Sequence, residues 1–275
     1  MKKYAIIGYP LTHSISQFIH ESLFNLSKVD ASYEVLQTPP ENFDELETLL
    51  NSLDGYNVTI PYKNAALKFT DSLDDFSKIS GSVNVIKNAD IRLGYNTDVF
   101  GFCETLRAQG IDPKKECDCL ILGCGGTGRM VLTYLASVQK KISVAVLNPA
   151  DPDLNEIKNN LNALYPACEI TFVDIKSSAI SGDLCINTTP VGMFPNINAS
   201  PLSDEQIKRC GTIFDLVYNP LETLLVKKAH SFGISASTGL LMLVLQAVKA
   251  HEIWYGACFS PEQINTIYEA CKTKM

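Results

Sequence analysis

The fold is decided by the stretch Cys117-Asp118-Cys119-Leu120-Ile121-Leu122-Gly123-Cys124-Gly125-Gly126-Thr127-Gly128. Its first half predicts a buried strand, and its second half matches the pattern G-x-G-x-x-G. We predict a helix over 129–137, so the pattern lies between a strand and a helix, which is the context that dinucleotide binding requires. Glycines there let the backbone approach a pyrophosphate at the helix N-terminus. The stretch therefore predicts a dinucleotide-binding unit in preference to a merely structural glycine turn.

The residues that follow continue an alternation of strands and helices. We predict strands over 142–147, 169–173, 184–187 and 212–216, with helices over 154–164 and 224–232. This alternation is typical of a parallel sheet. The loop from Thr188 to Met193 follows the carboxyl end of a strand, where such sheets place their ligands.

The second strand of this unit ends at Asn148, where a dinucleotide site usually contacts the ribose. An NAD site carries Asp or Glu there, and an NADP site carries Arg near the 2′-phosphate. This chain has Asn148-Pro149-Ala150-Asp151-Pro152-Asp153 instead. The residues themselves therefore leave the choice between NAD and NADP open.

The first 60 residues read strand, helix, strand, helix, strand, over 3–8, 17–25, 31–36, 41–52 and 57–60. That pattern predicts a second sheet that is mostly parallel. A polar run over 70–78 then precedes a predicted hairpin, with strands over 81–86 and 91–94. The charged residues 114–116 mark a domain boundary, and helices over 238–255 and 261–271 end the chain.

Lys63 closes a stretch that reads Asn57-Val58-Thr59-Ile60-Pro61-Tyr62-Lys63. Alternation predicts that Val58 and Ile60 face one side of a short strand and Thr59 the other. The proline ends the strand because it cannot donate to a ladder. Residues 62–69 predict a helix, so Lys63 lies in a first turn, where the macrodipole disfavours an ammonium. Local sequence leaves two interpretations, an exposed lysine or a proton donor of lowered pKa.

Three further polar residues lie at predicted helix starts. Ser14 and Ser16 precede the helix over 17–25 and point the same way if the chain is extended. The pair is explained by one N-cap as well as by two hydroxyl donors to a carboxylate. Asp98 also begins a helix and is either a cap or a functional carboxylate.

Composition limits the classes of function. With 275 residues, 46% apolar and 19% charged, the chain is typical of a globular protein long enough for two domains. Its apolar runs are too short for a signal peptide or a bilayer span. A net charge of −7 argues against nucleic acid or membrane surfaces as partners. Nine scattered cysteines indicate core packing in a reduced, cytoplasmic protein, without a metal site.

Together these segments resemble the shikimate dehydrogenase family along essentially the whole chain. The matching stretches, in family order and spacing, are Ser14 to Ser16 with His20, Asn57 to Lys63, Gly81 to Asn84, Gly94 to Asp98, Gly123 to Arg129, Asn187 to Met193, Asp215 to Thr223 and Gly239 to Ala247. The resemblance implies a two-domain α/β fold with a cleft between the domains. A discontinuous substrate domain of residues 1–102 and 238–275, with a mostly parallel sheet, would carry a Rossmann-type NAD(P)-binding domain of residues 103–237 as an insertion.

The resemblance also implies the reaction, a reversible NADP-linked reduction of 3-dehydroshikimate to shikimate in aromatic biosynthesis. Lys63 would donate the proton to the ketone oxygen, and Asp98 would orient Lys63 and the substrate hydroxyl. The substrate would be held by Ser14, Ser16, Thr59, Asn84, Tyr218 and Gln246. The cofactor would be held by Gly123, Gly125, Gly126, Thr127, Gly128, Asn148, Thr188, Met193, Val217, Gly239 and Met242.

The chain departs from the family pattern in several places. Gln17 and Glu21 stand where the family commonly has Pro and Asn, and Tyr62 stands where it commonly has His. The family's Asn-Arg-Thr after the second Rossmann strand is here Asn148-Pro149-Ala150. Without the arginine, and with acidic residues nearby, a 2′-phosphate meets poor electrostatics. We therefore expect a weakened preference for NADP, or use of NAD.

Three hypotheses about function follow. The first is a shikimate dehydrogenase, the second is an NAD-dependent quinate/shikimate dehydrogenase, and the third is a catalytically silent dinucleotide sensor on the same fold. The presence of both Lys63 and Asp98 speaks against the sensor, which would not need both. In each case we expect a small-molecule ligand and a monomer or homodimer.

Overall fold

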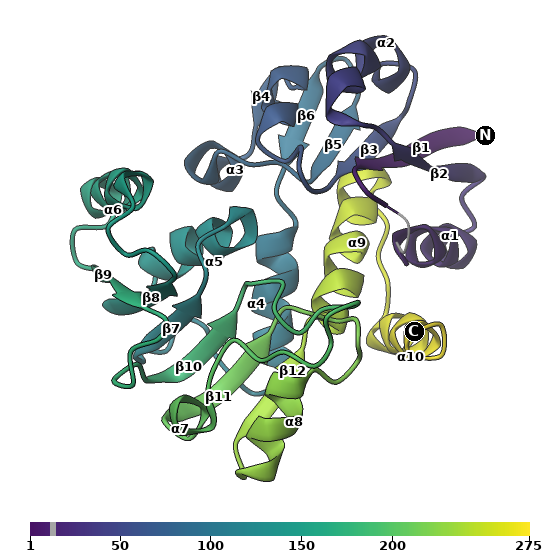
Figure 1. Cartoon of the computed structure of the whole chain (residues 1–275). Helices are drawn as coiled ribbons and strands as arrows, with labels where there is room; N and C mark the ends of the chain where they lie inside the picture. Colours follow the sequence, from purple (N-terminus) through teal and green to yellow (C-terminus); the bar gives the residue numbers. More distant parts are fainter. Residues whose placement is uncertain (12–14) are drawn as a thin grey trace. The chain divides into compact units, whose positions relative to one another are not determined.

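The computed structural model describes residues 1–11 and 15–275, and the chain divides into two compact units. Residues 1–104 and 242–274 form the first unit, and residues 105–241 form the second (Figure 1). Both crossings between the units lie inside helices, α4 (Asp98–Ala108) and α9 (Leu240–Tyr255). The chain therefore passes from one unit to the other through helical backbone.

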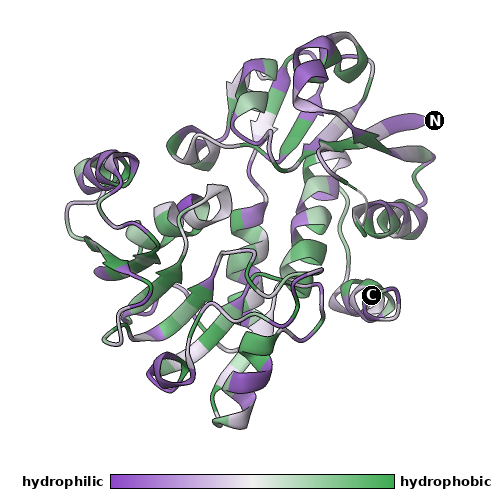
Figure 2. Ribbon diagram, viewed as in Figure 1, coloured by the Kyte–Doolittle hydropathy of each residue, from purple (hydrophilic) through white to green (hydrophobic). Residues whose placement is uncertain are grey.

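The first unit is built on a six-stranded sheet in the order β2-β1-β3-β5-β6-β4. Strand β1 pairs in parallel with both β2 and β3, as the βαβαβ pattern predicts, and β5 and β6 form the predicted antiparallel hairpin. The short β4 lies in the polar run over 70–78. Apolar residues concentrate in the strands (Figure 2). The strands are β1 (Lys2–Gly8), β2 (Ala31–Gln37), β3 (Gly55–Val58), β4 (Ser72–Leu73), β5 (Val85–Asn88) and β6 (Arg92–Tyr95).

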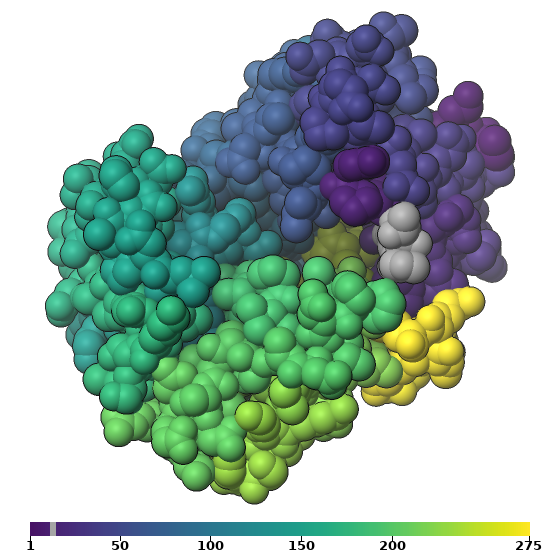
Figure 3. All heavy atoms as spheres, viewed as in Figure 1, coloured from purple at the N-terminus to yellow at the C-terminus, as the bar shows by residue number. Residues whose placement is uncertain are grey.

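Helices of the first unit come from both ends of its sequence. They are α1 (Ser16–Ser27), the 3₁₀ helix η1 (Pro40–Leu46), α2 (Glu47–Leu50), the 3₁₀ helix η2 (Ala65–Phe69), α3 (Asp75–Ser80), α4, α9 and α10 (Pro261–Lys272). Figure 3 shows the yellow atoms of α10 against the purple atoms of the N-terminal elements, where α10 contacts α1. Ser260 caps α10, since its hydroxyl accepts from the Gln263 backbone N–H while the Gln263 side chain accepts from the Ser260 N–H.

Two predictions for residues 41–60 of this unit were wrong in detail. The single helix over 41–52 is instead η1 followed by the one-turn α2, in a segment whose acidic residues repel one another at α-helical spacing. Ile60 does not pack beside Val58, because β3 ends at Val58 and the alternation ends with it. The Ile60 side chain is 68% exposed, whereas Val58 is 2% exposed.

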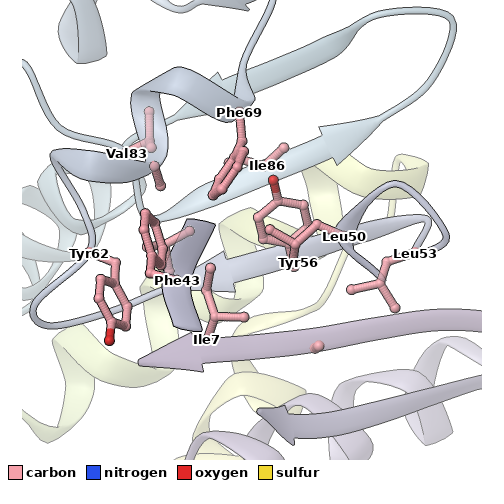
Figure 4. Close-up of a cluster of buried hydrophobic side chains, with 12 residues drawn as sticks. Ile7, Phe43, Leu50, Leu53, Tyr56, Tyr62, Phe69, Val83 and Ile86 are labelled. Atoms are coloured by element: carbon pink, nitrogen blue, oxygen red, sulfur yellow. The ribbon is translucent and has the colours of Figure 1, made fainter. Parts of the chain in front are cut away.

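The core beside β3 explains why the helix after it begins late. Tyr62 is buried, its ring stacks on Phe43 at 4.2 Å between centroids, and its hydroxyl donates to the Thr38 carbonyl. Figure 4 shows this cluster, in which Phe69 and Ile7 also point inward. Because Tyr62 is anchored in the core, the helix starts at Ala65, and Lys63 precedes it instead of lying in its first turn.

The second unit contains a six-stranded, wholly parallel sheet in the order β12-β11-β10-β7-β8-β9. Counted from β7, this is the doubly wound Rossmann order, with its reversal point between β7 and β10. The prediction of a Rossmann-type α/β unit is confirmed. The strands are β7 (Cys119–Leu122), β8 (Lys141–Val146), β9 (Glu169–Asp174), β10 (Gly182–Asn187), β11 (Cys210–Asp215) and β12 (Ser235–Thr238).

Helices cover the sheet of the second unit, as parallel crossovers require. They are α5 (Gly126–Ala136), α6 (Pro152–Leu164), α7 (Asp204–Ile207) and α8 (Leu224–Ser231). The pattern did not predict α7 or β12, which are each only four residues long. Helix α5 begins three residues before the predicted start, so the last glycines of the motif lie within its first turn. Within the described part of the chain, we find no helix of the length and apolarity that a bilayer crossing needs.

Candidate active site

The glycine loop of the second unit connects β7 to α5, and its glycines have different roles. Gly123 has φ of +87°, which only glycine adopts without strain, and it makes the tight turn after β7. A Cβ on Gly125 or Gly126 would meet nothing within 4 Å. A Cβ on Gly128 would lie 2.7 Å from the Gly123 carbonyl oxygen, so a side chain there would push α5 away from the loop.

These roles fit a dinucleotide pyrophosphate. The open side at Gly125 and Gly126 allows a phosphate to reach the backbone N–H groups at the start of α5. Thr188 follows β10, and its hydroxyl donates to the carbonyl of Leu122, the last residue of β7, at 2.8 Å. This hydrogen bond joins the ends of the two strands between which the strand order reverses. Open sheets of this type bind ligands at that point. The motif therefore has the backbone geometry that its pattern predicts.

The described residues 147–153, which follow β8, include no lysine or arginine that could bind a 2′-phosphate. Leu147 is 81% exposed, and the Asn148 side chain accepts from the Ala150 backbone N–H at 3.3 Å. Asp151 caps α6 by accepting from the Asp153 N–H, which places two carboxylates at the start of that helix. This corner is acidic and apolar, and it is less suited to an added phosphate than to free ribose hydroxyls.

The remaining predicted cofactor residues are not all in the second unit. Val217 is buried, and its carbonyl accepts from the Gly239 N–H at 3.2 Å, so these two backbones are fixed together. Met193 is 45% exposed in the loop after β10. Met242 belongs to the first unit and is buried there on α9. The predicted substrate residue Tyr218 follows Val217, and burial raises the pKa of its hydroxyl.

The first unit brings the predicted catalytic pair into contact. Lys63 Nζ lies 2.5 Å from Asp98 Oδ2, and the two side chains are 21% and 13% exposed. Lys63 follows β3, and Asp98 opens α4, where the helix macrodipole favours a carboxylate. A lysine that is held against a carboxylate and still reached by solvent can give a proton as the ammonium and take one back as the neutral amine.

Asn84 joins this pair to the other predicted polar residues. Its Nδ2 atom donates to Asp98 Oδ1 at 2.9 Å and approaches Gln246 Oε1 at 3.4 Å. Its Oδ1 atom accepts from the Thr97 backbone N–H at 2.7 Å. Lys63, Asn84, Asp98 and Gln246 are far apart in the sequence, and the fold collects them into one network of hydrogen bonds.

The three hydroxyl residues that were predicted to bind the substrate, Thr59, Ser16 and Ser14, differ in what the structure shows of them. Thr59 lies four residues before Lys63, and its backbone N–H donates to the Ile7 carbonyl at 2.9 Å, beside the end of β1. Ser16 is buried and is the first residue of α1. Ser14 lies outside the described residues. The N-cap of α1 is Ile15, without a side-chain hydrogen bond, so Ser16 does not act as the cap.

Sequence reasoning missed two residues, Tyr33 and Asn57, whose hydrogen bonds hold the backbone of Asn84. Tyr33 Oη donates to Asn57 Oδ1 at 2.6 Å, and Asn57 Nδ2 donates to the Asn84 carbonyl at 3.3 Å. Both side chains are buried. Asn57 was recognisable as a polar residue on the Thr59 face of the stretch, whereas nothing local pointed to Tyr33 as its partner.

A buried histidine pair was also missed. His20 Nδ1 lies 2.9 Å from His251 Nε2, and His251 Nδ1 contacts the Tyr255 hydroxyl, which lies 3.1 Å from Ser27 Oγ. Ser27 donates its hydrogen to the Leu23 carbonyl, so the hydroxyl of Tyr255 donates to Ser27 and accepts from His251. Burial lowers the pKa of His251 to about 3 and holds that of His20 well below its usual value. Both rings are therefore neutral.

The described residues include no group of three or more His, Cys, Asp or Glu side chains that could hold a metal ion. The chemistry that the site residues offer is proton transfer at Lys63 and hydrogen bonding from the neighbouring amides. Such a set can polarise a carbonyl and orient the hydroxyls of a small polar molecule.

Comparison with known proteins places these features in a family. Residues 6–86 match the family model described as the shikimate dehydrogenase substrate binding domain. The shikimate dehydrogenase (NADP(+)) of Clostridium beijerinckii is 36% identical over 266 residues, which cover 92% of each chain.

Two solved structures extend this comparison. The crystal structure of a chorismate mutase/shikimate 5-dehydrogenase fusion protein from Clostridium acetobutylicum is 32% identical, with a TM-score of 0.90 over 100% of this chain and 98% of that one. Shikimate 5-dehydrogenase from Listeria monocytogenes, in complex with shikimate and NAD, is 25% identical, with a TM-score of 0.88 over 98% of this chain and 96% of that one. This chain therefore belongs to the shikimate dehydrogenase family.

Proposed function

We propose that this chain catalyses the reversible NADP-linked reduction of 3-dehydroshikimate to shikimate, a step of aromatic biosynthesis. The observation that carries the proposal is the 2.5 Å contact between Lys63 Nζ and Asp98 Oδ2. The name of the Clostridium beijerinckii relative and the shikimate in the Listeria monocytogenes structure support the choice of reaction and substrate. The match covers 92% of the Clostridium beijerinckii relative, so the proposal concerns the whole activity of that relative.

In this proposal Lys63 moves the proton. The bound nicotinamide supplies the hydride chemistry, and the protein positions the reactants. Negative charge develops on the carbonyl oxygen as its carbon is reduced, so an ammonium beside that oxygen stabilises the transition state and donates a proton to it. In the reverse direction the neutral amine of Lys63 takes the proton back. Asp98 holds Lys63 Nζ, and Asn84 holds the second carboxylate oxygen of Asp98 at 2.9 Å.

We assign most of the substrate binding to the first unit and most of the cofactor binding to the second, with Tyr218 and Met242 as the two exceptions. Ser14 and Ser16 bind the substrate carboxylate, and the ring hydroxyls are bound by Thr59, Asn84 and Gln246, with a contribution from Tyr218. The pyrophosphate is bound by the glycine loop from Gly123 to Gly128, and the remainder of the cofactor by Asn148, Thr188, Met193, Val217, Gly239 and Met242. The protein acts in the cytoplasm on a small-molecule substrate, as a monomer or a homodimer.

A second candidate function is an NAD-linked shikimate or quinate dehydrogenase. The observation that favours it is the end of β8, where the exposed Leu147 and the carboxylates of Asp151 and Asp153 stand in place of a cation. The Listeria monocytogenes relative was solved with NAD, so NAD is compatible with the family fold. The Ser14 and Ser16 pair leaves the choice between shikimate and quinate open.

One assay separates these functions. Steady-state rates are measured with shikimate and with quinate, each with NADP and with NAD. Turnover of shikimate with NADP at the highest kcat/KM supports the first candidate, and a higher kcat/KM with NAD supports the second. Cofactor binding without turnover in any of the four combinations would overturn both enzyme proposals and leave the silent dinucleotide sensor.

A further inference from the structure

A buried carboxylate lies at the end of the second unit's sheet that faces its glycine loop. Asp215 is the last residue of β11, is 0% exposed, and pairs in register with Asn187, the last residue of β10. Both strands end on the edge where Gly123 and Thr188 meet at the reversal point of the sheet.

Three segments donate hydrogen bonds to this one carboxylate. Asn187 Nδ2 and the Val217 backbone N–H donate to Asp215 Oδ1 at 2.8 and 3.1 Å. The Thr223 hydroxyl donates to Oδ2 at 2.6 Å while it also caps α8. The carboxylate therefore ties the end of β10, the loop after β11 and the start of α8 to a single point.

The charge is costly at this position. The three donors are all neutral, and burial raises the pKa of Asp215 to about 6. A buried carboxylate whose partners are all neutral loses hydration that its hydrogen bonds only partly replace. The arrangement therefore needs an explanation other than stability, and the segments that Asp215 fixes suggest one.

Those segments carry residues of the proposed cofactor and substrate sites. Asn187 Oδ1 accepts from both the backbone N–H and the hydroxyl of Thr189, at 3.0 and 2.7 Å, which fixes the loop that begins with Thr188. Val217 and Tyr218 form the loop after β11, and the N–H of Val217 is held directly by Asp215. One side chain thus sets the relative position of the loops after β10 and β11.

We propose that Asp215 is a positioning residue for cofactor binding, which holds the loops that carry Thr188 and Val217 in the arrangement that receives the dinucleotide. This inference rests on the proposed function only in naming the cofactor. The competing explanation is that Asp215 stabilises the second unit and does nothing for the ligand. The two explanations differ in what happens to cofactor affinity at temperatures where every variant is folded.

The test compares isosteric variants with a matched control. Asp215→Asn removes the charge and the acceptor for Thr223, and Thr223→Val removes the hydroxyl, whereas Thr223→Ser keeps it. The control is Gln139→Met, because Gln139 is also buried in the same unit and also makes three hydrogen bonds. Its partners are the carbonyls of Pro113 and Lys115 and the N–H of Cys117, at the opposite end of β7.

Dissociation constants for NADPH and NADH are measured by calorimetry on the full chain at 20 °C, together with melting temperatures. We expect Asp215→Asn and Thr223→Val to weaken binding of the preferred cofactor at least tenfold, and Thr223→Ser to stay within threefold of the parent protein. Gln139→Met should lower the melting temperature and leave both dissociation constants within twofold.

If Asp215→Asn and Thr223→Val only lower the melting temperature, as Gln139→Met does, the positioning role is overturned. Thr223→Val keeps the test decisive if Asp215→Asn does not fold. Because the readout is binding and not turnover, a parent protein that binds cofactor without catalysis would overturn the proposed function and still test this inference.

Discussion

Replacing Lys63 by methionine should abolish most activity while the fold is kept. Methionine has a similar length and an apolar stem, so the change removes the ammonium and little packing. The substitution removes one close contact, the 2.5 Å ion pair between Lys63 and Asp98. The side chain of Asp98 is 13% exposed. Asp98 keeps the hydrogen bond from Asn84 Nδ2 at 2.9 Å, so its carboxylate is not left without a donor.

This geometry allows an estimate of two quantities, the fall in kcat and the loss of unfolding free energy. Removing a general acid–base group lowers kcat by about two to four orders of magnitude. At 1.36 kcal/mol per factor of ten, this raises the barrier by about 3 to 5 kcal/mol. Exposed ion pairs contribute about 0.2 to 1 kcal/mol, and losing one partner of a fully buried pair costs about 3 to 5 kcal/mol. For this partly exposed pair with a remaining donor we expect a loss in unfolding free energy of about 1 to 2 kcal/mol.

The assay measures kcat for shikimate oxidation at saturating cofactor and the urea midpoint of unfolding. Lys68→Met is the matched control, because Lys68 lies five residues further on, is 44% exposed and pairs with the exposed Asp44. The control should keep kcat within twofold. A kcat for Lys63→Met within tenfold of the parent value would refute the assignment of Lys63 as the proton donor.

Three further predictions concern other parts of the chain. Ala150→Arg should raise the NADP-to-NAD ratio of kcat/KM at least tenfold, because it adds a cation beside the 2′-position, and Ala150→Met should leave the ratio unchanged. Gly128→Ala should weaken cofactor binding at least tenfold in a fluorescence titration, since its Cβ would lie 2.7 Å from Gly123 O and from Thr188 Oγ1. The pKa of His251 is lowered to about 3 in the fold, so unfolded chains bind the extra proton and stability falls as pH drops below about 6.5. Between pH 7.5 and 5 we expect a loss of about 2 kcal/mol from this group, measured by urea unfolding, and His251→Gln should flatten the slope. An unchanged slope would contradict that role.

The sequence contained most of the fold because the regular elements depend on local patterns. The strand-loop-helix around Gly123 predicted the parallel sheet of the second unit, and the alternation of the first 60 residues predicted the parallel strands β1, β2 and β3 of the first. The order of strands in the second unit follows from the same motif, since a G-x-G-x-x-G after a strand marks the first strand of a doubly wound sheet. Elements of only two to four residues, such as β4, α7 and β12, were missed because they show no periodicity.

The site was less accessible from sequence because it depends on contacts between distant residues. Resemblance to a family, and not local pattern, singled out Lys63 and Asp98. Local alternation placed Ile60 in the core, whereas the strand ends two residues earlier and leaves Ile60 exposed. The contact between His20 and His251 joins residues 231 positions apart, and no periodic or spacing signal in a single sequence records such a pairing.

The course of the chain between the two units has a consequence for any attempt to divide the protein. Because α4 and α9 each run without interruption across a boundary, a fragment of residues 105–241 would contain only the last four residues of α4 and the first two of α9. Each cut would remove backbone hydrogen bonds from the helix that it interrupts. Loss of order in one unit would in the same way fray a helix that continues into the other. Because helix formation is cooperative, we expect a single melting transition for the entire chain on heating.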